Sequence, residues 1–523
     1  MGAIFDNKKE IPGEITVAME QQPKAKVSPD SNYLILLLVR LSLIAVSGLA
    51  VFYALGQHVL RNWDESIYAE IAKEMLNRHS WLTPHFDFRP WLEKPPLFMW
   101  LTTLMFRLFG VSEFSARVTG ALCGVGTIWL TFEIGRRLMD EWVGLTAALV
   151  LLTNGYFLYV IRFGSIDMPL TFCLTLVAYA YVRVRQGDPR WWYAAGAATG
   201  MAVMLKGAAG AAAPMALCLA LLIDRRFAEL RSPEVRNSAL LACAIALPWH
   251  LAMLFTYGRR FLNEYIGYQV IARATKAIEG RAHDLPAYFY LQEYWQFFLP
   301  FALLALVGLV LYIRGQQDSS IVVSYVLVIT LGFTLVRTKL HTYVVPAFPF
   351  ISLLAALAIR TLLKNARYAA ICALVLFPLY WFFQTKERPD AFEVNYSKAY
   401  VPPGPITSQQ DPLMRLLLQA QAGNSEPAGA PLIVCFDGLI IEKQQLLFYS
   451  ERPVLESFFS TTPDSSRESR YWSPIPLELA VGSRSSPIII PAEMSPELAY
   501  SGNYNFEAIA TDGPLVLGQI SRR

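Results

Sequence analysis

The sequence predicts a polytopic α-helical membrane protein that ends in a small soluble α/β domain. Hydrophobic residues make up 54% of the 523-residue chain, and the mean hydropathy is +0.36, both far from the values of a soluble protein. Apolar runs of about 17 to 25 residues recur between residues 33 and 384, and this is the length that crosses a bilayer core of about 30 Å. Beyond residue 385 the chain becomes rich in Pro, Ser and Glu and contains no such run.

Residues 1–32 are predicted to form a polar cytoplasmic N-terminus, because they contain four lysines and no apolar core of a signal peptide. The net charge of +4 fits basic cytoplasmic loops. No basic run interleaved with aromatic residues indicates nucleic-acid binding. Five of the six cysteines lie in apolar runs, and neither a CxxC nor an HExxH motif occurs. The sequence therefore indicates neither a disulfide framework nor a standard zinc motif.

The membrane domain is predicted to cover residues 33–385, with about eleven spans. Each expected span is an apolar run between polar or turn residues, and the runs cover residues 33–55, 114–136, 142–162, 167–184, 191–205, 208–223, 237–256, 291–313, 320–337, 343–361 and 367–384. The run 97–109 is only about 13 residues long, which is too short to span. It is predicted to be an interfacial or re-entrant helix.

Lysine and arginine in the short loops predict the orientation of the chain. With a cytoplasmic N-terminus, the small basic loops that follow residues 136, 183, 225, 314 and 360 all fall on the cytoplasmic side. The opposite side then holds the longer polar segments, which are residues 58–96, 162–167, the turn at Lys206, 257–290, 338–342 and everything after 384. We therefore expect a multi-pass inner (plasma) membrane protein. Its first loop, 58–96, and its C-terminal domain, 386–523, would be extracytoplasmic.

Short apolar segments between turn residues predict the strands of the C-terminal domain. They are residues 431–438, 446–450 and 486–494, and a helix is expected around 409–421. We find no catalytic constellation in this domain.

Ionisable and polar side chains gather on the extracytoplasmic side of the predicted membrane domain. They are Asp64, Glu65, Glu93, Lys94, Asp167, Lys206, Arg273, His283, Lys339, His341 and Tyr343. Ionisable groups at membrane depth cost several kcal/mol each on most scales and by default indicate function.

Each of these residues also has a structural explanation. Asp64 and Asp167 each precede a helical run and could cap it. Glu65 could be a solvated helix position, and the histidines could be structural. The cations near span ends could anchor the helices at the interface. It is the convergence of carboxylates and cations on one side that favours a functional site.

Such a cluster suits a reaction of a lipid-linked sugar phosphate, whose phosphate lies at the membrane–water boundary. Lys206, Arg273 and either Lys94 or Lys339 could neutralise the phosphate as it becomes the leaving group.

A carboxylate on the other face of the sugar could deprotonate the acceptor hydroxyl, and Asp64 or Asp167 could fill this role. Glu65, next to Asp64, is the third predicted catalytic residue. A carboxylate together with His283 could also hold a divalent metal ion, although the spacing shows no dedicated site.

Several motifs resemble a known family. WDESIYAE (63–70), SWLTP (80–84), EKPPL (93–97), RFGSIDMP (162–169) and KLHTYVVPAFP (339–349) resemble the bacterial aminoarabinose lipid A transferase family. That family is related to the protein O-mannosyltransferases, and both belong to the GT-C class of membrane glycosyltransferases. The resemblance covers most of residues 30–385.

This resemblance implies an inverting transfer from a polyprenyl-phosphate sugar, hexosyl or pentosyl, to a lipid, glycan or protein acceptor. The matching positions imply a lead catalytic carboxylate at Asp64, a second one at Asp167, a residue near a bound metal at Glu93, and a lining aromatic at Tyr343. The phosphate-contacting cations would be Lys94, Lys206 and Arg273.

One departure from the family pattern leaves the sugar open. Ser66-Ile67 replaces the threonine-arginine pair that is common in the aminoarabinose enzymes, so neither aminoarabinose nor lipid A is assigned. Two other functions remain as alternatives, a lipid or sugar flippase and a catalytically silent scaffold. Transporters tend to place ionisable groups near the midplane, often in repeated halves, and neither feature is visible here.

Overall fold

The computed structural model describes the helical part of the chain and most of its C-terminal strands. The described residues are 29–61, 64–276, 285–315, 320–363, 416, 432–435, 448, 454–458, 475–481, 486–492, 495–500, 503–513 and 515–523. The chain divides into two compact units, Met1–Leu43 and Ile44–Arg523. In the first unit, the described part is the beginning of helix α1 (Pro29–Phe52). The second unit contains all the contacts discussed below.

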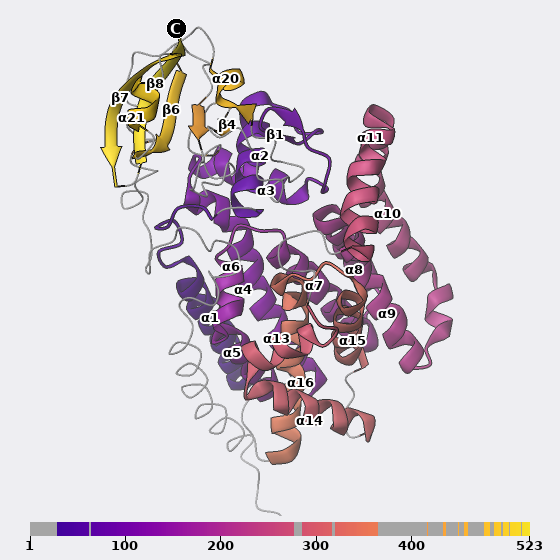
Figure 1. Ribbon diagram of the computed structural model, residues 1–523. Coiled ribbons are helices and arrows are strands. Elements are labelled where there is room, and N and C mark those ends of the chain that lie inside the picture. Colours follow the sequence, from indigo (N-terminus) through magenta and orange to yellow (C-terminus); the bar gives the residue numbers. More distant parts are fainter. Residues whose placement is uncertain are drawn as a thin grey trace, which may run out of the picture. The chain divides into compact units, whose positions relative to one another are not determined.

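Helices α2 to α16 form the helical part of the chain that precedes the C-terminal strands (Figure 1). Their bounds are α2 (Asp64–Arg78), α3 (Leu97–Phe109), α4 (Glu113–Leu138), α5 (Glu141–Leu152), α6 (Gly155–Ile161), α7 (Asp167–Arg185), α8 (Trp191–Lys206), α9 (Ala212–Ile223), α10 (Pro233–Tyr257), α11 (Arg259–Phe261), α12 (Arg273–Thr275), α13 (Phe289–Phe298), α14 (Phe301–Ile313), α15 (Ser320–Leu335) and α16 (Phe348–Leu363). Three other helical turns matter for the site: the 3₁₀ helices η1 (Gly207–Ala211) and η5 (His341–Ala347), and the π-helix η3 (Leu262–Ala272). Helix α4 packs on α5 and α7, α8 packs on α7 and α10, and α16 packs on α5 and α14.

Four helical segments of the described residues are long and apolar enough to cross a membrane, or up to six if each of two bent pairs is one span. The four segments are Glu113–Leu138, Trp191–Ile223, Pro233–Tyr257 and His341–Leu363. These helices agree with the predicted class of membrane protein. The number of eleven spans stays a prediction, and the expected span 367–384 lies outside the described residues. The two spans expected within 191–223 form one helical run in the structure, interrupted by η1.

Two of the expected spans, 142–162 and 291–313, each correspond to a bent pair of helices. Helices α5 and α6 meet at 73°, because the side chain of Asn154 accepts the N–H of Phe157 at 2.8 Å and starts a new helix. The chain bends by 114° between helices α13 and α14 at Leu299-Pro300. Proline has no N–H group to continue the hydrogen bonding of the helix. The short helix predicted at 97–109 is confirmed as α3, with 13 residues.

The C-terminal strands form a six-stranded mixed sheet with the order β5-β4-β3-β6-β8-β7. Its strands are β3 (Leu432–Cys435), β4 (Val454–Phe458), β5 (Ile475–Pro476), β6 (Ser486–Pro491), β7 (Tyr504–Asp512) and β8 (Leu515–Arg522). Strands β3 and β6 confirm two of the predicted strands. The third, 446–450, is wrong at its one described residue, because Phe448 is helical. Leu416, inside the predicted helix 409–421, is helical.

Phe448 packs against the helices that begin the membrane domain. Its side chain is 6% exposed and belongs to a buried cluster with Ala72 of α2 and Phe106 of α3. The Lys73 ammonium donates to the Phe448 carbonyl oxygen at 2.6 Å and lies 5.2 Å from the centre of the Phe448 ring. Phe448 thus packs on the face of α2 that carries Ala72 and Lys73.

We expect Phe448→Ala to lower the stability of the full-length protein by about 3–5 kcal/mol, the usual range for a buried phenylalanine. Thermal unfolding in detergent, followed by tryptophan fluorescence, measures the effect. Phe255→Ala is the control, because Phe255 is 83% exposed. An equal melting temperature for the two variants would show that the packing of Phe448 contributes nothing.

Candidate functional site

The first turn of α2 is fixed by a buried ion pair between Glu65 and Arg117 of α4. The Glu65 side chain is fully buried, and the Nε atom of Arg117 lies 2.7 Å from its Oε1. The Nη2 atom of Arg117 donates to the other oxygen at 3.1 Å. The backbone N–H groups of Arg61 and Gly164 donate to the same carboxylate at 2.6 and 2.9 Å. Burial raises the pKa of Glu65, but Arg117 and these donors outweigh it and hold the pKa below its ordinary value.

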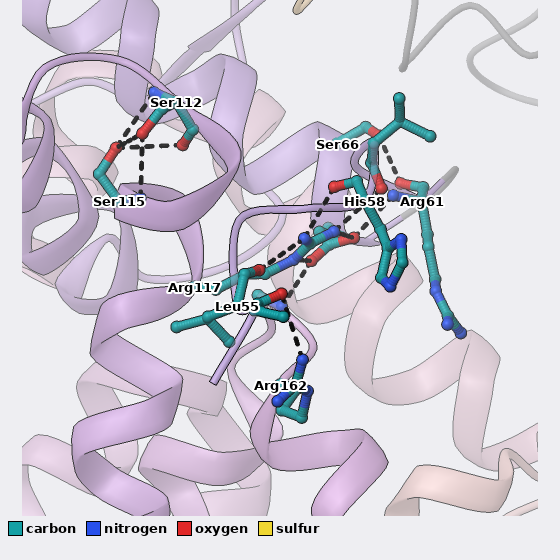
Figure 2. A network of polar contacts seen from close by, with 12 residues as sticks. Leu55, His58, Arg61, Ser66, Ser112, Ser115, Arg117 and Arg162 are labelled. Carbon is teal, nitrogen blue, oxygen red and sulfur yellow. Dashed lines mark hydrogen bonds and ion pairs between the residues drawn. The ribbon is translucent and has the colours of Figure 1, made fainter. Parts of the chain in front are cut away.

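Arg117 also joins this pair to the chain that leaves α1, as Figure 2 shows. Its guanidinium donates to the carbonyl oxygens of Leu55, His58 and Val59 at 3.0, 2.8 and 3.0 Å. Arg162 donates to the carbonyl oxygen of Tyr53 at 2.7 Å, which satisfies a group that has no helical partner. These partners favour a positioning role for Glu65 over the catalytic role that the sequence predicts.

Asp64, the neighbour of Glu65, has a different environment. Its side chain is 40% exposed, and the Lys94 ammonium lies 3.6 Å from its carboxylate. The Tyr68 hydroxyl hydrogen-bonds to the Asp64 carboxylate, and Lys94 donates to the same hydroxyl. Partial burial raises the pKa of Asp64, but Lys94, Lys206 and Arg273 outweigh it and hold the pKa below its ordinary value. Asp64 is therefore an accessible carboxylate that is ionised at neutral pH.

A second group of charged residues surrounds Tyr343 of η5. Asp167 begins α7, is 3% exposed, and forms an ion pair with Lys206 at the end of α8. The Lys206 ammonium lies 4.7 Å from the centre of the Tyr343 ring. The Nη1 atom of Arg273 donates to the Tyr343 hydroxyl at 3.0 Å. One tyrosine therefore contacts both cations.

The charged residues around Asp64 and those around Tyr343 act as one electrostatic cluster. Lys206 and Arg273 both lower the pKa of Asp64, after the nearer Lys94. Lys94, Lys206 and Arg273 thus lie around two carboxylates, Asp64 and Asp167. Such a site favours an anion, and it offers ionic and hydrogen-bonding groups suited to a phosphate.

The outcome differs for three other predicted site residues, Glu93, Lys339 and His283. Glu93 is 5% exposed and accepts from the Gln269 side chain at 2.5 Å. Lys339 is 7% exposed, and its ammonium donates to the Val336 carbonyl oxygen at 2.9 Å rather than to either carboxylate. His283 lies outside the described residues. Among the residues that the structure does describe, no group of three or more His, Cys, Asp or Glu side chains could hold a metal ion. The metal site at Glu93 and His283 therefore stays a prediction.

Sequence reasoning missed Tyr68, Arg117 and Gln269 as contributors to the site. Tyr68 follows Asp64 by four residues, a spacing that places both on one face of a helix. Gln269 precedes Arg273 by the same interval, so both signals were present in the sequence. The pairing of Arg117 with Glu65 spans 52 residues and has no local signal.

Glu70, one turn further along α2, is a second buried carboxylate of this helix. It is 2% exposed, and its Oε2 lies 2.8 Å from the Lys73 ammonium. Burial raises the pKa of Glu70 to about 7, with Lys73 opposing the change and Glu74 and Asp87 adding to it.

Comparison with known proteins gives a consistent family resemblance. The sequence profile of the dolichyl-phosphate-mannose-protein mannosyltransferase family matches residues 93–269. A protein of Aquifex aeolicus is 30% identical over 309 residues, which cover 58% of this chain and 60% of that protein. The undecaprenyl phosphate-alpha-4-amino-4-deoxy-L-arabinose arabinosyl transferase of Pseudomonas savastanoi pv. phaseolicola is 30% identical over 347 residues, 63% of this chain and 62% of that protein. The chain thus spans about three fifths of the length of these curated relatives.

Solved structures show the same fold. ArnT from Cupriavidus metallidurans, bound to undecaprenyl phosphate, aligns with a TM-score of 0.68 at 18% identity, over 94% of this chain and 98% of that one. The archaeal oligosaccharyltransferase AglB from Archaeoglobus fulgidus aligns with a TM-score of 0.53 at 12% identity, over 89% and 70%. The predicted resemblance to GT-C membrane glycosyltransferases is confirmed.

We expect Glu65→Gln to destabilise the protein by about 3–5 kcal/mol, because it leaves the Arg117 charge buried without its partner. Thermal unfolding of the purified full-length protein tests this. The double variant Glu65→Gln/Arg117→Met should recover part of the loss. Glu229→Gln is the control, because Glu229 pairs with the more exposed Arg226 and should cost less than about 1 kcal/mol. Equal losses for both glutamates would contradict the importance of the buried pair.

The raised pKa of Glu70 predicts a pH dependence of stability. The folded protein holds the Glu70 proton up to about pH 7, whereas the ordinary pKa is 4.5. The contribution of Glu70 to the free energy of unfolding is therefore fully present below pH 4.5 and is lost as the pH rises through 7. Melting temperatures of wild type and Glu70→Gln between pH 5 and 8 should diverge, with the variant gaining at high pH. The control is Glu507→Gln, because Glu507 is exposed on β7. Its melting temperatures should follow those of the wild type across this pH range. Parallel curves for Glu70→Gln would refute the shift.

Proposed function

We propose that this chain is a glycosyltransferase that moves a sugar from a polyprenyl-phosphate donor to an acceptor on the extracytoplasmic side of the membrane. The observation that carries the proposal is the cluster in which accessible, ionised Asp64 lies beside the three cations Lys94, Lys206 and Arg273. The names of similar proteins support it, since one relative is an undecaprenyl phosphate arabinosyl transferase. ArnT, which shares the fold, was solved with undecaprenyl phosphate.

The cations supply the stabilisation that the leaving group needs. When the bond between the sugar C1 atom and the phosphate oxygen breaks, the phosphate gains one negative charge. Lys206 and Arg273, both in contact with Tyr343, are held where they can neutralise this charge, and Lys94 supplies a third cation. Donors that are fixed before the reaction stabilise the transition state without reorganising.

Asp64 is the proposed general base. It takes the proton of the acceptor hydroxyl while the acceptor oxygen bonds to C1 on the face opposite the leaving phosphate, which inverts the configuration. The free carboxylate is a weak base because three cations lower its pKa. A bound phosphate shares these cations, so donor binding raises the pKa of Asp64 and strengthens the base. Asp167 is buried and paired with Lys206, and its proposed role is to hold that cation.

The sugar and the acceptor are not specified by these contacts. Ile67, at a position where aminoarabinose enzymes commonly have arginine, is 6% exposed and packs in the core. The chain therefore offers no cation at this position. The proposal includes no metal-dependent step.

We expect Asp64→Asn to reduce sugar transfer by about 100-fold or more, the scale of a lost general base. The full-length protein is reconstituted in liposomes with a membrane lipid extract of its source, and released undecaprenyl phosphate is measured by mass spectrometry. Asp188→Asn is the control, because Asp188 is 39% exposed and paired with Arg183, an environment similar to that of Asp64.

Full activity of Asp64→Asn would remove Asp64 from the chemistry. Movement of the lipid-linked sugar across the bilayer without release of undecaprenyl phosphate would favour the flippase alternative.

A further inference from the structure

The turn between Lys206 and Gly207 is shaped by a side chain that the reaction itself does not use. Gly207 has φ +52° and ψ −120°, a conformation that favours glycine. A Cβ atom at this position would lie 2.4 Å from the hydroxyl oxygen of Tyr265. The tyrosine hydroxyl therefore lies directly against the backbone that follows Lys206.

The Tyr265 hydroxyl is itself held by His250 of α10. The Nε2 atom of His250 lies 2.8 Å from this hydroxyl, and Nδ1 lies 2.7 Å from the Ala246 carbonyl oxygen. A carbonyl oxygen can only accept, so in the neutral ring Nδ1 carries the proton and Nε2 accepts from Tyr265. Tyr265 is 6% exposed, and its ring stacks on Phe261 with 5.1 Å between ring centres. Both ends of the Tyr265 side chain are thus fixed.

Tyr265 belongs to the π-helix η3. This helix and the residue that follows it, Arg273, contact three separate parts of the site. Tyr265 lies against Gly207, Gln269 donates to Glu93, and Arg273, the residue after η3, donates to Tyr343. These three residues recur every four positions along the chain. Segments of π-helix occur frequently at functional sites. This one connects the Lys206 turn with the segments that carry Glu93 and Tyr343.

We propose that Tyr265, oriented by His250, is a positioning residue that holds Lys206 in place for the phosphate group of a polyprenyl phosphate. This inference rests on the proposed function. With the hydroxyl in place, the turn at Gly207 cannot relax toward Tyr265, and the Lys206 ammonium stays between Asp167 and the Tyr343 ring. Without the hydroxyl, the turn gains space and His250 loses its buried donor. Lys206 is then less well ordered when the phosphate binds.

A double-mutant cycle tests this coupling between Tyr265 and Lys206. Binding of undecaprenyl phosphate to the full-length protein in nanodiscs is measured for wild type, Tyr265→Phe, Lys206→Ala and the double variant. We expect Tyr265→Phe to weaken binding by roughly 3- to 10-fold, the scale of one hydrogen bond. In the Lys206→Ala background it should have no further effect.

Tyr257→Phe is the matched control, because the Tyr257 hydroxyl bonds to Thr83 at 3.4 Å rather than lying against Gly207. It should leave binding unchanged in both backgrounds. If Tyr265→Phe does not fold, Gly207→Ala replaces it, since the new methyl group would meet the Tyr265 hydroxyl and displace the same turn. That variant too should lose its effect on binding in the Lys206→Ala background.

The outcomes separate this inference from the function on which it rests. If Lys206→Ala weakens binding but Tyr265→Phe has no effect, or weakens binding equally in both backgrounds, the positioning role of Tyr265 is overturned and the proposed function stands. If Lys206→Ala binds undecaprenyl phosphate as tightly as wild type, the proposed phosphate contact of Lys206 itself fails.

Discussion

The structure around the site depends on the buried ion pair between Glu65 and Arg117. Burying two charges is costly unless each is paired and hydrogen-bonded, and here the pair has further partners in the backbone at Arg61, Leu55 and Gly164. The same contacts that satisfy the pair therefore bring the end of α1, the start of α2, α4 and the turn before α7 together. Because Glu65 is fixed, its neighbour Asp64 has a defined position at the start of α2.

The two adjacent carboxylates thus have separate roles, and so do the two aspartates of the cluster. Asp64 is 40% exposed and keeps room for a substrate group, whereas Asp167 is 3% exposed and is paired with Lys206. An accessible carboxylate can reach the hydroxyl of an acceptor, whereas a buried one has less room for a substrate. This difference in exposure is the basis of the roles proposed for Asp64 and Asp167.

The sequence predicts those features that depend on local composition. The charged first loop, the start of α2, the short helix α3 and the membrane class all follow from runs of polar or apolar residues. What it could not predict depends on tertiary contact. At the bend, the side-chain amide of Asn154 donates to the carbonyl oxygen of Phe297, 143 residues away, and Arg117 contacts Glu65 across 52 residues. Lys339 has the residue type of a phosphate ligand, yet its ammonium bonds to a nearby carbonyl oxygen, a side-chain conformation that no sequence pattern encodes.

The charges of the cluster also explain why base and leaving group can share one set of cations. Lys94, Lys206 and Arg273 lie around Asp64 and Asp167, and in the proposed reaction the donor phosphodiester binds among these cations. In the proposed reaction Asp64 gains a proton as the phosphate gains a negative charge, and the total charge of the site does not change. The cations that hold Asp64 ionised before donor binding are then free to stabilise the product phosphate. The same electrostatic cluster thereby links deprotonation of the acceptor to departure of the lipid phosphate.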